Sequence, residues 1–261
     1  MNIYVETNFV LELASMQEQH ESCEKIIGLC EAGSATLVLP AFCVAESYET
    51  LIRRAKRRTQ IANALAGELR QLSRSKPYKD EIDAFQSITG LLARSSQEED
   101  QRLIAVLERV LKIADIIPLE AGIVLNATQY RVTYKFEPQD SIVYSSVLHH
   151  LASAGGVESC FINRNRRDFD DPDIEESLAN QGCKMLFSFT NGYNYIQHRI
   201  NTALAVEKIW ARRTNKGLQR TALCAHEIGA ILKPGFGLNA LAIYWCAAAE
   251  AWAVSPPRRQ R

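Results

Sequence analysis

Short apolar runs alternate with long stretches of helical periodicity along the first 200 residues. Four apolar runs predict buried strands: Asn2–Val5, Ala35–Leu39, Ser159–Ile162 and Met185–Phe189. Ile116–Ile117, directly before Pro118, predicts no more than a brief extended piece. Because the strands are separated by helical segments, the pattern predicts an α/β fold with a central parallel sheet flanked by helices.

The segments between these runs carry apolar residues three and four positions apart, which predicts helices. The first helix follows Val5 immediately, with Thr7 and Asn8 as candidate caps. A long helix is expected from Ala41 toward Ser75, where Pro77 ends it. The other predicted helices are Gln17–Glu31, Asp80–Arg94, Gln97–Ala114, Glu120–Tyr130, Asp140 to about Ala152, Asp171–Leu178 and Tyr193–Arg199.

The charged residues divide the chain into two parts. The whole chain is formally neutral, but residues 1–200 carry 21 basic and 27 acidic side chains, whereas residues 201–261 carry nine and three. We therefore predict one domain over 1–200 and a basic C-terminal extension over 201–261, to which we assign no function.

Cysteine usage and hydropathy predict a cytoplasmic protein with no membrane partner. None of the seven cysteines forms a CxxC pair, and no leader with basic and apolar regions begins at Met1. The most apolar stretch, Ala240–Ala249, has ten residues, and a membrane helix needs roughly 20.

Three carboxylates are predicted at the carboxyl ends of parallel strands, where α/β proteins bind their ligands. Glu6 follows the first strand, and Glu46 lies in the helix after the second. Asp140 falls on the apolar stripe of its helix, although a first-turn aspartate is also favoured by the helix dipole alone. Converging carboxylates without a Cys/His cluster favour Mg²⁺ or Mn²⁺, ions that turn water into a nucleophile and hold phosphate oxygens.

A basic run follows Glu46 on the same predicted helix and suits a polyanion that enters an acidic site. It consists of Arg53, Arg54, Arg57 and Arg58. The alternative is a solvated helix face on which Glu49 and Arg53 form an i,i+4 pair. No GxGxxG motif or P-loop stands at a strand-to-helix turn, so a nucleotide cradle is not supported.

Four short motifs in the expected order resemble PIN-domain proteins, the fold of VapC-type toxin ribonucleases. They are VETNFVLELA, Glu46 in the following helix, QDSIVYSSVL and FINRNRRDFDDPDI, and together they cover about residues 1–199. The resemblance implies a three-layer α/β fold and a metal-dependent endonuclease that acts on RNA. It also implies an antitoxin protein or a second copy of the chain as candidate partners.

The resemblance assigns the site position by position. Glu6, Glu46 and Asp140 match the family's first three acidic residues, and Asn8 matches the polar residue after the first acid. Asn165 stands where the fourth acid usually lies. The catalytic assignment is therefore Glu6, Glu46, Asp140 and Asn165.

Two departures from the family pattern leave a second interpretation open. Glu6 is one methylene longer than the usual aspartate, and Asn165 lacks a charge, with Asp168 close enough in sequence to substitute as a ligand. We expect Glu6, Asp140 and Asp168 to bind the metal, and Arg164 and Arg166 to join the basic run in binding RNA. The alternative is a degenerate PIN domain that binds RNA or a protein without cleavage.

Overall fold

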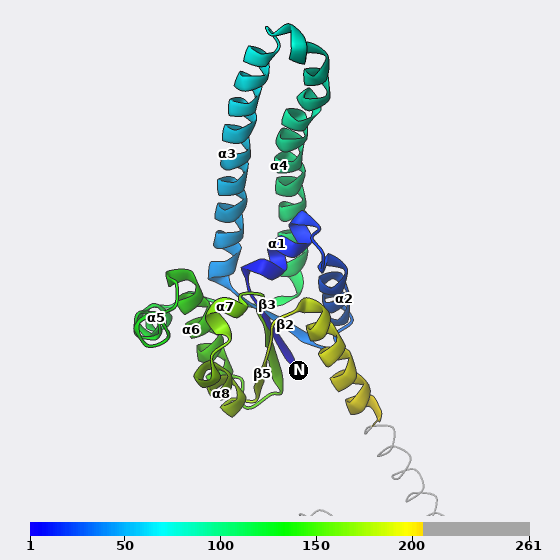
Figure 1. Cartoon of the computed structure of the whole chain (residues 1–261). Helices are drawn as coiled ribbons and strands as arrows, with labels where there is room; N and C mark the ends of the chain where they lie inside the picture. The colour runs from blue at the N-terminus through cyan, green and yellow to red at the C-terminus, as the bar shows by residue number, and fades with distance from the viewer. Residues whose placement is uncertain (206–261) are drawn as a thin grey trace, which may run out of the picture. The chain divides into compact units, whose positions relative to one another are not determined.

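A five-stranded parallel sheet forms the centre of the protein (Figure 1). The computed structural model describes residues 1–205, except the side chains at 79–81, 83, 84 and 86. The strand order is β3-β2-β1-β4-β5. The strands are β1 (Asn2–Val5), β2 (Thr36–Pro40), β3 (Ala114–Ile117), β4 (Ser159–Ile162) and β5 (Cys183–Leu186). The predicted α/β class with a parallel sheet is confirmed.

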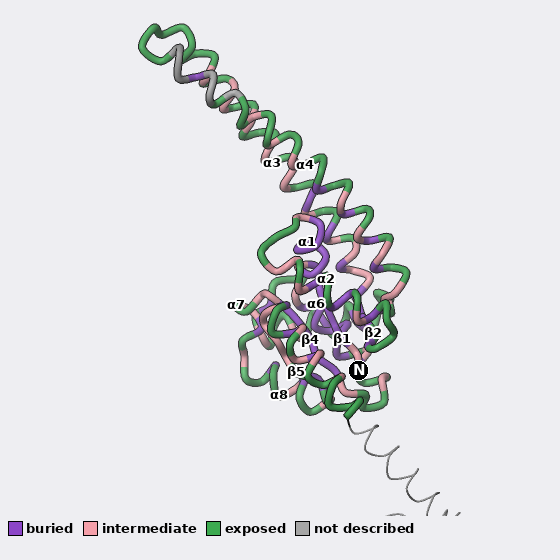
Figure 2. The backbone as a smooth tube through the Cα atoms, turned by 90° about the vertical axis from the view of Figure 1, so that its right-hand side faces the viewer, coloured by how far each residue is buried: buried purple, intermediate pink, exposed green. Residues whose placement is uncertain are grey.

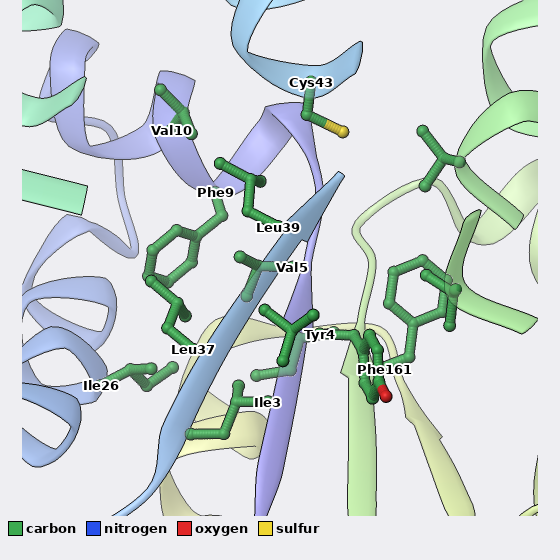
Figure 3. Close-up of a cluster of buried hydrophobic side chains, with 14 of the residues drawn as sticks. Ile3, Tyr4, Val5, Phe9, Val10, Ile26, Leu37, Leu39, Cys43 and Phe161 are labelled. Atoms are coloured by element: carbon green, nitrogen blue, oxygen red, sulfur yellow. The ribbon is translucent and has the colours of Figure 1, made fainter. Parts of the chain in front are cut away.

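β1 lies at the centre of the sheet, between β2 and β4. Ile3 is in register with Leu37 on one side and with Cys160 on the other. Both faces of this strand are covered, because Ile3, Tyr4 and Val5 are all fully buried. Figure 3 shows Tyr4 and Phe161 on one side of the strands and Phe9, Ile26 and Leu37 on the other.

Two strand predictions were incomplete. The brief extended piece at Ile116–Ile117 is part of β3, an edge strand of the sheet. The last strand begins at Cys183, two residues before the predicted start, because the turn at Gly182 (φ 71°) ends there. Phe189 lies beyond this strand and packs against Phe9, with ring centroids 5.4 Å apart.

Helices cover both faces of the sheet and complete the three-layer fold (Figure 1). Residues 189–205 are helical and extend the helix predicted at Tyr193–Arg199 in both directions. Asp171 caps the helix that follows it, since its side chain accepts the Asp173 N–H. The helices of the layers are α1 (Thr7–Ser15), α2 (His20–Glu31), α5 (Ala121–Tyr134), α6 (Pro138–Ser153), α7 (Arg166–Phe169) and α8 (Pro172–Asn180).

Two long helices form a hairpin that projects from the sheet and its layers (Figures 1 and 2). They are α3 (Ala41–Leu72) and α4 (Lys79–Ile113), joined by a 3-10 turn at Lys76–Tyr78. The prediction of two helices before Ala114 was wrong. Ser95 and Ser96 do not break α4, because both hydroxyls donate to the Leu92 carbonyl within the helix.

Residues Met1–Ile200 form one compact unit. Within residues 1–205, no helix is both long enough and apolar enough to span a membrane. The apolar stretch Ala240–Ala249, and nearly all of the extension predicted over 201–261, lie outside the described residues.

Candidate active site

Glu6 is the residue that connects β1 to α1. Its backbone is extended (φ −129°), and its Oε2 caps the helix by accepting the Asn8 N–H at 2.8 Å. The predicted caps, Thr7 and Asn8, are therefore one and two positions too late. The side chain is buried, and its second oxygen, Oε1, has no hydrogen-bond partner among the described residues. Glu6 thus has a buried carboxylate oxygen that accepts no hydrogen bond from the described residues.

The electrostatics of Glu6 tie it to two other candidates. Burial raises the pKa of Glu6 to about 7, against the lowering effect of the Asn8 hydrogen bonds. The negative charges of Asp140 and Glu46 raise this pKa further. These three carboxylates therefore lie within electrostatic reach of one another, as the sheet topology predicts.

Glu46 belongs to the part of α3 that follows β2. Its Oε2 accepts the Thr7 hydroxyl, which links the start of α1 to α3. Burial raises the pKa of Glu46, and the neighbouring Glu49 raises it further. The end of β1 and the end of β2 therefore bring their acidic residues to the same edge of the sheet.

Asp140 lies in the first turn of α6, and Asn165 fixes its carboxylate. Burial raises the pKa of Asp140 to about 6, the Asn165 hydrogen bond lowers it, and Asp168 and Glu46 raise it. Asn165 Nδ2 donates to Asp140 Oδ2 at 3.0 Å and to Asp168 Oδ2 at 2.7 Å. The Asn165 amide thus joins two carboxylates that would otherwise repel each other.

The segment after β4 is held in place by its own side chains. Asn163 is buried, and its Oδ1 accepts the Asn165 N–H at 2.7 Å. α7 begins at the next residue and places Asp168 in its first turn. Asp168, proposed from the sequence as a substitute ligand, accordingly lies beside Asp140.

Sequence reasoning missed Glu12, a buried carboxylate in α1. Its side chain is 1% exposed, accepts the Gln19 N–H and forms an ion pair with Arg164, whose side chain is 33% exposed. Arg164 therefore anchors the segment after β4 to α1 and is not a free cation. The signal was present in the sequence, because Glu12 interrupts the apolar run from Phe9 to Leu13.

The predicted RNA-binding arginines divide by their contacts. Arg58 makes two hydrogen bonds to Glu99, at 2.9 and 3.0 Å, across the hairpin. Arg53 lies 4.0 Å from Glu49 with both side chains exposed, which is the i,i+4 pair of the alternative interpretation. Arg166 donates to Asp170 at 2.8 Å. The described residues provide no ion pair for Arg54 or Arg57.

The donor set fits a divalent cation by its chemistry. Among the described residues, no three or more His, Cys, Asp or Glu side chains are gathered closely enough to hold a metal ion. The uncompensated Glu6 oxygen nevertheless requires either a proton or a cation, since a buried carboxylate is costly when unpaired. Carboxylate oxygens are the ligands that Mg²⁺ and Mn²⁺ prefer.

A five-stranded parallel sheet with acidic residues at its carboxyl edge places the chain among α/β proteins with a polar site at the strand ends. A model of the PIN domain matches residues 3–169, and the chain belongs to this family. PIN domains are generally nucleases, and the match includes every candidate acidic residue of the site. Neither the curated proteins nor the solved structures contain a match to this chain.

Proposed function

We propose that this protein is a metal-dependent endoribonuclease that binds Mg²⁺ or Mn²⁺ through Glu6, Asp140 and Asp168. The observation that carries the proposal is the buried Glu6 oxygen, which has no partner in the described part of the chain and lies near two further carboxylates. The ionised form of such an arrangement is unfavourable without a bound cation, and it becomes favourable when a cation neutralises it.

The side chains around the site have distinct tasks in this proposal. The bound ion would activate a water molecule and hold phosphate oxygens. Asn8 fixes one oxygen of Glu6 and leaves the other open, while Asn165 orients Asp140 and Asp168. Glu46, oriented by the Thr7 hydroxyl, has a raised pKa and is the candidate to take the proton of the attacking water.

RNA is the proposed substrate because cations continue from the acidic site along α3. At 100° per residue, Arg53 and Arg57 lie within about 20° of Glu46 on the helix surface. Arg57 is exposed and Arg54 is half-exposed, so both are available to phosphate groups. Arg58 and Arg164 are held by Glu99 and Glu12 and serve the fold instead.

Cleavage of a labelled single-stranded RNA by the purified full chain tests the proposal. We expect internal cleavage with Mg²⁺ or Mn²⁺, none with a chelator, and a loss of at least about 100-fold in rate for Glu6→Gln and Asp140→Asn. Glu176→Gln is the matched control, because Glu176 is exposed on α8, and it should cleave like the parent.

The second candidate is a PIN domain that binds RNA or a protein without cleavage. The amide at Asn165 and the lack of a gathered ligand set among the described residues favour it. RNA binding with no metal-dependent cleavage by the parent chain would support this candidate and contradict the nuclease proposal.

A further inference from the structure

The hairpin of α3 and α4 is far less buried than the rest of the described protein (Figure 2). From residue 52 to residue 98, Ile82 is the one buried residue among the described side chains. Residues that face the opposite helix, such as Leu65, Leu69 and Leu92, remain half-exposed. Two helices bury only one narrow face of each other, and helix bundles cover more apolar surface by adding further helices.

Large apolar side chains are concentrated on one side of the outer half of the hairpin. The Arg58–Glu99 bond fixes which levels of the two antiparallel helices are opposite. Each residue of an α-helix is rotated by about 100° from the one before it. Counted from Arg58 and Glu99, this rotation places Ile61 and Leu72 of α3 on the same side of the hairpin as Ile88 and Leu91 of α4. We call these four residues the distal patch. Their exposed fractions are 49%, 42%, 39% and 55%.

Near the sheet, the same side of the hairpin is already covered by a third helix. Arg102 Nε donates to the carbonyl of Ala14, close to the end of α1, at 2.7 Å. Leu91 lies three turns farther toward the tip on nearly the same stripe of α4, because 11 residues rotate by about 20° beyond three full turns. The distal patch therefore continues a helix-packing surface that α1 occupies near the sheet and leaves beyond Ser15.

We propose that the distal patch is the interface with a second copy of this chain, whose hairpin packs against it to form a four-helix bundle. The patch exposes roughly 370 Å² of apolar surface if each large side chain carries about 200 Å². A standard interface buries about 800 Å² per partner, of which about 57% is apolar. Two distal patches thus supply most of the apolar area that a stable dimer needs, and a two-fold axis uses both at once.

Light scattering during size exclusion of the full chain tests this interface without any nuclease readout. We expect twice the mass of one chain. Leu91→Glu and Ile61→Glu should each raise the dissociation constant at least about tenfold, because a charge is placed in an apolar contact. Ile52→Glu is the matched control: Ile52 is 65% exposed but turns to the opposite side of the hairpin, so its dimer should be unchanged.

Three outcomes would overturn the proposal. A parent chain that is monomeric at all accessible concentrations would show that residues 206–261, another protein or solvent covers the patch. A dimer unaffected by Leu91→Glu and Ile61→Glu, or one weakened equally by Ile52→Glu, would place the interface elsewhere. Leu91→Gln, with helicity followed by circular dichroism, separates lost association from lost folding.

Discussion

The sheet and the hairpin of this PIN-domain protein are stabilised in different ways. Around β1, large side chains such as Tyr4 and Phe161 are fully buried, and the burial of their apolar surface offsets the conformational entropy that the chain loses on folding. Along α3 and α4, most side chains are exposed or half-exposed, and the stability of these helices depends on the one face along which they contact each other. The site lies where the two regions meet, since Glu6 follows β1 and Glu46 belongs to α3.

The largest expected effect on stability comes from comparing the same substitution, phenylalanine to alanine, in the sheet and in the hairpin. Phe161→Ala should lower the free energy of unfolding by about 3–5 kcal/mol, because a fully buried ring is replaced by a cavity. Phe85→Ala on the hairpin should cost less than about 1 kcal/mol, because the ring is already 48% exposed. Urea unfolding of dilute protein measures both. Equal losses would show that the hairpin contributes as much packing as the sheet.

A smaller loss is expected from the buried ion pair that joins α1 to the segment after β4. Glu12→Gln should destabilise the protein by roughly 2–3 kcal/mol, since Arg164 loses its buried partner and keeps only partial access to water and the more distant, exposed Glu18. Glu21→Gln, on the exposed surface of α2, is the control and should change little. A Glu12→Gln variant as stable as the parent in urea would mean that water replaces this ion pair without cost.

The order of elements was predictable from the sequence wherever burial sets the pattern. The strands at Asn2–Val5 and Ser159–Ile162 are central, and their unbroken apolar runs gave their bounds correctly. The edge strand β3 was recognised only as an extended piece, because two apolar residues before a proline carry little pattern. The projection of the hairpin could not be predicted, since helical periodicity does not say whether a helix covers the sheet or leaves it.

The site was predictable to a similar extent. Strand ends in a parallel sheet meet at one edge, which is why Glu6 and Glu46 could be grouped from the sequence. Asp140 does not follow a strand, and it was added because it lies on the apolar stripe of its helix and matches the family's third acid. The sequence did not show which arginines form ion pairs and which are available to RNA, because a partner can be distant in sequence. Glu99, for example, is 41 residues from Arg58. Resemblance to the PIN family is confirmed, while the VapC-type subclass and an antitoxin partner remain predictions.

The third prediction concerns pH and the metal. The folded-state pKa of Glu6 is raised from 4.5 to about 7, so the metal-free protein should lose stability as pH rises from about 4.5 through 7. The loss should be on the order of 3 kcal/mol, because ionisation is easier in the unfolded chain. Glu6→Gln should remove this part of the pH dependence, and Glu176→Gln should retain it, when Tm is followed with chelator present.

Added Mg²⁺ or Mn²⁺ should reverse this loss, because a cation bound by the folded state alone stabilises it by mass action. The rise in Tm should be larger at pH 8 than at pH 5.5, where protons compete for Glu6 and Asp140, whose pKa values are raised to about 7 and about 6. A metal response that is independent of pH, or that persists in Asp140→Asn, would place the cation elsewhere.

The smallest expected effect on stability comes from the cations of α3, which should act on RNA alone. Arg54→Ala with Arg57→Ala should leave Tm nearly unchanged, because neither side chain has an ion pair among the described residues. The same double variant should weaken RNA binding and reduce the slope of log K against log salt by about 0.7 for each lost phosphate contact. Arg70→Ala with Arg74→Ala is the matched control, since these exposed arginines lie near the tip of the hairpin, more than a dozen residues beyond Arg57. If both double variants lower the slope equally, RNA follows the whole hairpin; if neither does, the arginines near Glu46 form only a solvated helix face.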